Sequence, residues 1–135
     1  MGCIFCEILN GSRNAHFVYT DEYHTAFLDR YPIDIGHTLV IPKKHHELIT
    51  DMEPIQVGRL FSIVPKIASA VLKATAADGF SLGQNNGRVA NQIIPHVHIH
   101  IIPRYSNRGT VWTKRKIIND SEMSSLTAKI RDCLH

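Results

Sequence analysis

The sequence lacks the features that mark membrane, secreted and disulfide-stabilised proteins. No apolar run in its 135 residues approaches the roughly 18 residues that a membrane span needs. The N-terminal segment MGCIFCEILNG carries an acidic residue where a signal peptide has a basic region. Three cysteines are too few, and odd in number, for a disulfide framework. We therefore expect a cytoplasmic protein with no membrane partner.

The sequence is also poor in net charge and in phosphate-loop motifs. A formal charge of +3 with 44% hydrophobic residues excludes a disordered chain, and the length suits a single domain spanning 1–135. Neither Gly-x-Gly-x-x-Gly nor Gly-x-x-x-x-Gly-Lys-Ser/Thr occurs, which excludes the common phosphate loops. A basic segment resembles a nucleic-acid-binding patch, with Arg104, Tyr105, Arg108, Trp112, Lys114, Arg115 and Lys116. The small net charge of the chain argues against a nucleic-acid partner.

Hydrophobic periodicity predicts an α+β domain. A long helix is expected over about 52–77, capped by Asp51 and kinked at Pro65, because proline lacks the amide hydrogen that a helix interior needs. Short helices are expected at 3–9 and from Ser121 onwards. Alternating or β-branched runs predict strands at 17–20, 24–29, 37–42 and 80–84, and across the histidine-rich run 96–102.

Histidine is the abundant residue, with nine in the chain. His96, His98 and His100 alternate with apolar residues, so in a strand their imidazoles share one face, roughly 6.6 Å apart. Three aligned polar rings would each need a partner in a core, which favours a functional site. Two chemistries fit: a metal site that activates water, or nucleophilic attack by one neutral imidazole on phosphorus. The spacing alone does not decide between them.

Cys3-Ile-Phe-Cys6 is the other chemical motif. A Cys-x-x-Cys pair is half of a zinc site, and the same pair can equally be two buried thiols.

The run from His96 to Ile102 resembles the His-φ-His-φ-His-φ-φ signature of the histidine triad (HIT) superfamily, where φ is an apolar residue. Further segments of the chain match the short prokaryotic-type proteins of the Hint-like branch: Cys3-Ile-Phe-Cys6, Ala26-Phe-Leu-Asp29, Gly36-His-Thr-Leu-Val-Ile-Pro-Lys-Lys-His45, Asn85-Asn-Gly87, Gln92 and Pro103-Arg104.

This resemblance implies the architecture of a HIT domain. It predicts an antiparallel sheet of about five strands with one long helix and short N-terminal and C-terminal helices. A catalytic core over 1–105 would be followed by the basic loop and C-terminal helix of 106–135. The resemblance also implies a homodimer, formed through the long helix and a shared sheet.

The resemblance implies a nucleotide hydrolase that cleaves at the α-phosphate of adenosine phosphoramidates or dinucleoside polyphosphates. His98 would be the nucleophile that carries the nucleotidyl group, supported by His100 and His37. The resemblance implies that a purine nucleotide is held by the polar residues Asp29, Asn85 and Gln92 and by an apolar pocket formed by Ile4, Phe5, Phe27 and Leu39. Large apolar side chains at those four positions also suit an ordinary core. The alternatives are a nucleotide-binding module with little turnover and a zinc-dependent hydrolase.

Two details depend on the branch of the family. Relatives with Cys-x-x-Cys complete a structural zinc site with two histidines, which here are His45 and His96 beside Cys3 and Cys6. Ile93 stands where Hint and Fhit proteins often carry Ser or Thr, so the phosphoramidate preference does not transfer directly.

Overall fold

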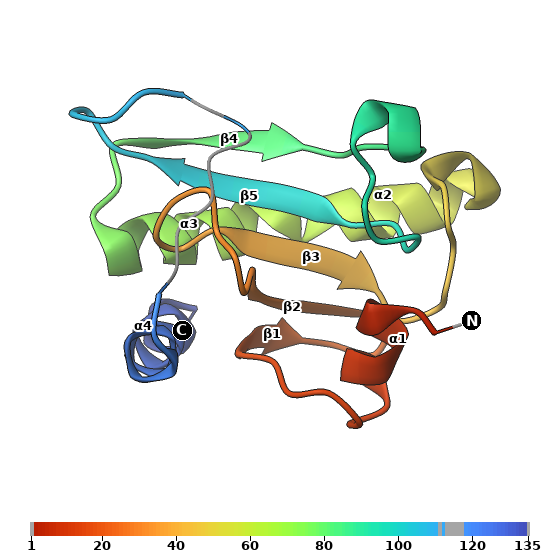
Figure 1. The fold of residues 1–135 in the computed structure, drawn as a ribbon, viewed down its shortest axis with the longest axis horizontal. Coiled ribbons are helices and arrows are strands. Elements are labelled where there is room, and N and C mark those ends of the chain that lie inside the picture. Colours follow the sequence, from red (N-terminus) through yellow and green to blue (C-terminus); the bar gives the residue numbers. More distant parts are fainter. Residues whose placement is uncertain (1, 111, 113–117, 135) are drawn as a thin grey trace.

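Within residues 2–110, 112 and 118–134, which the computed structural model describes, five strands form one antiparallel sheet. The spatial order is β1-β2-β3-β5-β4, which makes β1 and β4 the edge strands (Figure 1). The strands are β1 (Phe17–Thr20), β2 (His24–Leu28), β3 (Thr38–Pro42), β4 (Gly79–Gly83) and β5 (Ile99–Arg104).

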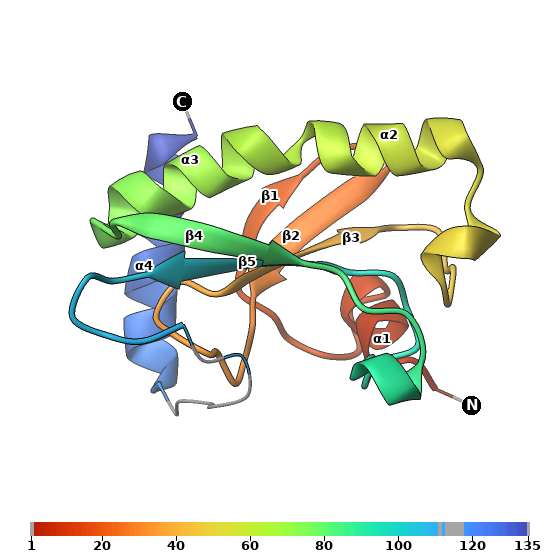
Figure 2. The same cartoon turned by 90° about the horizontal axis from the view of Figure 1, so that it is seen from above.

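Helices cover the sheet unequally. The helices α2 (Pro54–Ser62) and α3 (Val64–Thr75) run along one face, and the short helix α1 (Ile4–Leu9) lies on the other (Figure 2). The C-terminal helix α4 (Asp120–Cys133) packs against α3 and β1. Single 3-10 turns, η1 (Ile49–Asp51) and η2 (Arg88–Ala90), interrupt the long loops. The α+β architecture predicted from the sequence is confirmed.

Strand alternation divides the core into two clusters. Side chains such as Ala26, Val40 and Ile99 are buried beneath α2 and α3, together with Leu60 and Ile67 of those helices. On the opposite face, Phe27, Leu39 and Ile41 are buried with side chains of α1. Every second residue of β2, β3 and β5 therefore faces the α1 side, and this is the side to which His98 and His100 belong.

The predicted long helix is two helices. The chain leaves α2 at Ile63 and re-enters a helix at Val64, which puts Pro65 in the first turn of α3, where its missing amide hydrogen is not needed. The prediction that Asp51 caps the helix is wrong. Asp51 accepts a hydrogen bond from the Leu48 amide in η1, whereas Glu53 is the capping residue of α2, and its amide donates to the Gln56 side chain at 2.9 Å.

One helical stretch is long and apolar enough to cross a membrane by length and composition alone, which the sequence was not expected to provide. Pro54–Thr75 comprises 22 residues and contains an 18-residue window with a mean hydropathy of 1.4. In this fold, the apolar side chains of α3 such as Ile67, Ala68 and Val71 are buried against the sheet. Because 33% of that window is buried, core burial accounts for part of its apolar composition, while Ile55 and Phe61 of α2 are exposed.

The remaining differences lie at element ends. The histidine strand begins only at Ile99, so His96 and His98 precede β5. The C-terminal helix begins at Asp120, one residue before the predicted start, and buries Met123, Thr127 and Ile130. In the predicted basic loop, Lys114, Arg115 and Lys116 lie outside the described residues.

Candidate functional site

Two triad imidazoles lie together on the α1 side of the sheet. The ring centroids of His98 and His100 are 4.8 Å apart, closer than the strand repeat predicts because His98 precedes the regular strand. The ring of Phe5 from α1 stands edge-on to His98, with the centroids 5.1 Å apart. The N-terminal helix thereby forms one wall of the triad.

A backbone carbonyl sets the tautomer of His98. Its Nδ1 lies 2.7 Å from the carbonyl oxygen of His96, and a carbonyl can only accept, so Nδ1 carries the hydrogen. The lone pair of a neutral His98 is therefore on Nε2. Because the bond spans only two residues and is buried, it also fixes the direction of the ring.

A series of hydrogen-bonded polar groups lies behind His100. His37 is fully buried, and its Nδ1 accepts the Ile33 amide at 3.0 Å, which puts the hydrogen on Nε2. That Nε2 lies 2.9 Å from Nδ1 of His100 and 3.6 Å from the Asp29 carboxylate. His37 then donates to His100, and the hydrogen of a neutral His100 is on its Nε2. The structure thus brings His37, which is 63 residues away in sequence, to the triad.

The predicted apolar wall residues occupy two environments. Phe5, Phe27 and Leu39 are buried together, and the rings of Phe5 and Phe27 meet at 5.4 Å in an edge-to-face contact. Ile4, by contrast, is partly exposed at the start of α1. Only Phe5 of this group has a described ring contact with His98, so Phe27 and Leu39 act mainly as the core beneath α1.

The predicted polar residues are also placed differently from one another. The Asp29 carboxylate accepts the Tyr31 amide at 3.0 Å and lies beside His37. Gln92 is buried, with its side-chain oxygen accepting the Gly87 amide at 2.7 Å and its nitrogen donating to the Glu47 carbonyl at 2.6 Å. The Gln92 side chain therefore holds the loop before the triad.

Sequence reasoning missed the loop residue Asn86. Its side-chain oxygen accepts the Ile49 amide at 2.8 Å, and its nitrogen donates to Gln84 at 2.6 Å. The Asn85-Asn-Gly87 turn was the available signal, and it drew attention to Asn85. Gly87 has a φ of +91°, which explains the glycine at that turn. Ile93, which replaces the expected Ser or Thr, is 68% exposed.

Four donor atoms gather beside the triad at the N-terminus of α1. Nδ1 of His96 lies 3.5 Å from Sγ of Cys3, 3.7 Å from Sγ of Cys6 and 3.1 Å from Nδ1 of His45. Sγ of Cys6 lies 3.3 Å from Nδ1 of His45. Tetrahedral zinc bonded to two sulfurs and two nitrogens needs donor separations of about 3.3 to 3.8 Å. Three of these four separations lie in that range, and the two Nδ1 atoms at 3.1 Å need only a small adjustment, so the donor set suits zinc.

Protonation in this cluster also suits a cation. Nε2 of His96 lies 2.8 Å from the Pro42 carbonyl oxygen, which can only accept, so Nε2 carries the hydrogen of the neutral ring. Nδ1 of His96 then has a lone pair that faces the cysteines. Burial is the main reason that the pKa of His96 falls to about 4, which keeps the ring neutral at physiological pH. Burial and the adjacent Cys3 raise the pKa of Cys6. A bound cation would reverse that penalty by stabilising the thiolates.

A HIT domain model matches residues 10–107, most of the chain. The chain belongs to the HIT family. This HIT protein is 37% identical to a solved structure of a hypothetical histidine triad nucleotide-binding protein of Sulfolobus tokodaii, with a TM-score of 0.91. The match covers 98% of this chain and 91% of the Sulfolobus chain.

Two further similarities bear on the chemistry of this HIT protein. A zinc-bound histidine triad family protein of Mycobacterium smegmatis is 33% identical, with 99% of this chain and 94% of that chain covered and a TM-score of 0.85. The adenylylsulfatase HINT3 of Arabidopsis thaliana is 38% identical over 96% of this chain and 68% of its own length.

Proposed function

We propose that this HIT protein hydrolyses nucleoside 5′-phosphate derivatives at the α-phosphate through a nucleotidyl group on His98. The hydrogen bond from His98 Nδ1 to the His96 carbonyl carries the proposal, since it presents the Nε2 lone pair in a fixed direction. Family membership and the similarity to an adenylylsulfatase support the class of substrate.

The chemical step forms one bond to phosphorus and breaks another. Nε2 of His98 attacks the α-phosphorus as the bond to the leaving group breaks, and the leaving group departs with the bonding electron pair. Nε2–H of His100 points its proton toward the phosphoryl oxygens or the leaving group, and the His37 hydrogen bond holds that tautomer. Water then attacks the same phosphorus and the phosphorus–nitrogen bond breaks, with its electron pair returning to Nε2 of His98. The protons of the water pass to the departed leaving group or to solvent, which releases a nucleoside monophosphate and regenerates neutral His98.

The identity of the leaving group is the more specific part of the proposal. An amine, a second nucleotide or sulfate each places the same phosphorus before His98. Because the similar Arabidopsis protein is named an adenylylsulfatase, adenylyl sulfate joins adenosine phosphoramidates and dinucleoside polyphosphates as a test substrate. Asp29 is the proposed acceptor for the ribose hydroxyls, and Phe5 borders the purine.

A trapped intermediate distinguishes this enzyme from a binding module. A rapid alkaline quench, which preserves the phosphorus–nitrogen bond, followed by mass spectrometry should find one nucleotidyl group on His98. His98→Gln should lose the adduct and at least about 10³-fold in turnover while the near-UV circular dichroism is unchanged. His16→Gln changes a half-buried imidazole that pairs with Asp120 and is not part of the triad, so it is the control and should keep full activity. Unchanged turnover by His98→Gln would refute the proposal.

Zinc bound by Cys3, Cys6, His45 and His96 is proposed to be structural. Four protein ligands leave no open position for water, which argues against a zinc-dependent hydrolase. The metal would tie the start of α1 to the loops before β5 and after β3, while the His96 carbonyl continues to hold His98. Bound zinc supplies folding energy and needs no step of the reaction.

Metal removal provides a readout separate from activity. Chelation should release about one zinc ion per chain by elemental analysis and lower the melting temperature by roughly 5 to 10 °C. Cys6→Ser should reproduce the effect, whereas Cys133→Ser, on the distant α4, should not. An unchanged melting temperature after complete chelation is incompatible with a structural role.

A homodimer is proposed through α2 and the edge strand β4. Among the strands that the structure describes, β4 lies at one edge of the sheet, and it exposes Phe80 and Leu82 at 41% and 46%. Light scattering should give twice the 15.2 kDa chain mass, and Leu82→Lys should return the monomer mass. A monomeric wild-type chain at micromolar concentration would rule the dimer out.

A further inference from the structure

An open cavity lies on the opposite face of the sheet from the triad. It has a volume of about 360 Å³ and is bordered by the ends of β2 and β3 and the start of α2. His24 and Pro42, which pair in register, both line it. His24 is on the helix side because it alternates with Thr25 and lies in phase with Ala26 and Leu28, which are buried beneath α2 and α3. This cavity is therefore separate from His98.

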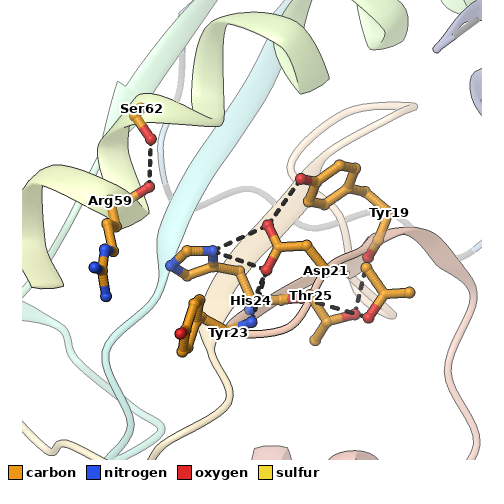
Figure 3. Close-up of polar contacts among 8 residues, drawn as sticks. Tyr19, Asp21, Tyr23, His24, Thr25, Arg59 and Ser62 are labelled. Atoms are coloured by element: carbon orange, nitrogen blue, oxygen red, sulfur yellow. Dashed lines mark hydrogen bonds and ion pairs between the residues drawn. The ribbon is translucent and has the colours of Figure 1, made fainter.

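A buried imidazole faces this cavity. His24 is only 6% exposed, and its Nδ1 lies 3.1 Å from the carboxylate of Asp21. Figure 3 shows the other ring nitrogen pointing away from Asp21, toward the side on which Arg59 lies. Because Asp21 accepts at Nδ1, the nitrogen that remains for a ligand is Nε2. His24 Nε2 is therefore placed to donate or accept a hydrogen bond on the cavity side of the ring.

The Asp21 carboxylate is a fixed anchor for that ring. It accepts the Tyr19 hydroxyl at 2.8 Å, the Tyr23 amide at 2.8 Å and the His24 amide at 2.7 Å (Figure 3). Although burial alone raises its pKa, these hydrogen bonds and that from His24 lower the pKa of Asp21 to about 2. The carboxylate is therefore ionised at physiological pH and holds His24 in one orientation.

The cavity carries an excess of positive charge. Lys43, Lys44 and Arg59 line it, with Glu22 as the one carboxylate among the described lining residues. In the part of the chain that the structure describes, none of the three cations forms an ion pair with a carboxylate. Three cations against Glu22 give the lining two more positive than negative charges, and the Asp21 carboxylate behind His24 reduces the local excess to one. A lining with net positive charge suits a phosphate monoester, which is anionic at pH 7.

The rest of the lining suits an organic group. The Tyr23 ring is 51% exposed, and the Arg59 guanidinium lies over it, 5.2 Å from the ring centroid. Pro42 and Met52 add apolar surface. The backbone is held in place, since the Lys43 amide donates to the Tyr23 carbonyl at 2.8 Å. Inorganic phosphate would leave most of the cavity empty, whereas small-molecule sites begin at roughly 300 Å³.

We propose that this cavity binds a small phosphate ester, with the phosphate near Lys43, Lys44 and Arg59 and the organic group against Tyr23 and Pro42. His24 Nε2 provides a directional hydrogen bond to the ligand. The ester could be the nucleoside monophosphate that a nucleotide hydrolase releases, or a sugar phosphate from elsewhere. The phosphate chemistry is common to both sources, and the site does not depend on turnover at His98.

Site-resolved titration tests the proposal. Full-length zinc-loaded protein labelled with ¹⁵N is titrated with adenosine monophosphate, ribose 5-phosphate and adenosine while amide shifts are followed. At least one phosphate ester should saturably shift the amides of Tyr23, His24 and Lys43, and adenosine should not. Tighter binding of adenosine monophosphate indicates the nucleotide source, and tighter binding of ribose 5-phosphate indicates the sugar phosphate.

Charge variants separate a built site from general attraction. Arg59→Gln should weaken the affinity measured at these amides about tenfold, and His24→Gln should weaken it with the fold retained. Lys73→Gln removes an equal charge from α3 and should change the affinity less than twofold. The proposal is overturned if neither ester shifts these amides, if adenosine shifts them equally, or if Arg59→Gln and Lys73→Gln have the same effect. Turnover at His98 should be unchanged in Arg59→Gln.

Discussion

Gly36, the residue before His37, provides a quantitative test of how the site is supported. Its φ of +92° lies in the region that favours glycine, so a side chain there strains the backbone by about 1 to 2 kcal/mol. An added Cβ would also lie 2.7 Å from Cγ2 of Thr75 and 3.1 Å from Cγ of Pro103. Ordinary carbon contacts are about 3.5 to 4.0 Å, so Gly36→Ala introduces a collision as well as backbone strain.

The neighbouring atoms cannot move away easily. The Thr75 hydroxyl donates to the Val71 carbonyl at 2.7 Å and accepts the Ala77 amide at 3.3 Å, so rotating Thr75 breaks hydrogen bonds at the end of α3. Pro103 is a rigid ring within β5. Overpacking of this kind costs about 1 to 3 kcal/mol. Gly36→Ala should therefore lower the free energy of unfolding by about 2 to 5 kcal/mol, or the melting temperature by roughly 7 to 18 °C.

Gly11→Ala is the matched control. Gly11 also has a positive φ, +86°, but its added Cβ would meet nothing within 4 Å. Urea unfolding should therefore show a loss of only about 1 to 2 kcal/mol in Gly11→Ala. The difference between the two variants measures the collision at Thr75 and Pro103. Equal losses would refute the argument, because they would mean that the close approach at Gly36 carries no energetic weight.

Three other substitutions probe separate parts of the fold. Asp21→Asn should lower the free energy of unfolding by about 1 kcal/mol at neutral pH. Because the pKa of Asp21 in the folded protein lies below the unfolded value of 3.8, the stability that the carboxylate provides is present above pH 4 and disappears as the pH falls toward 2. Unfolding of both proteins at several pH values will detect this, and a difference that does not change with pH would contradict it. Gly83→Ala places a Cβ 2.7 Å from the ring of Trp112, the single tryptophan, and should shift its fluorescence to the red; an unchanged spectrum would show that the ring does not lie there. Gly58→Ala has open space within α2 and should raise stability by about 0.5 to 1 kcal/mol in thermal unfolding, whereas a loss would indicate an unrecognised contact.

Local sequence patterns predicted most of the elements because they depend on neighbouring residues. The strand at 17–20, the helix at the N-terminus and the break near Pro65 follow from alternation, helix periodicity and the missing amide hydrogen of proline. The helix cap was misassigned because Asp51 and Glu53 both precede the apolar run. Their different hydrogen bonds depend on the η1 turn, which no local pattern identified.

The polar groups around the triad were harder to predict because their partners are distant in sequence. Gln92 was expected among the nucleotide-binding residues, yet its side chain bonds to the Gly87 amide and the Glu47 carbonyl. Likewise, nothing in the sequence indicated that Asp21 and His24 stand over a cavity lined by Arg59, since that requires the β2 end to meet α2.

The sequence by itself determined that His98 and His100 share one face, because side chains in an extended chain alternate with period two. It also indicated Cys3 and Cys6 as a pair of soft donors. Only the tertiary structure decided which nitrogen of each imidazole carries hydrogen, since this depends on the His96 carbonyl, the Ile33 amide and the Pro42 carbonyl. Folding likewise brought His45 and His96 to the cysteines, because metal donors and hydrogen-bond partners are selected by distance in space.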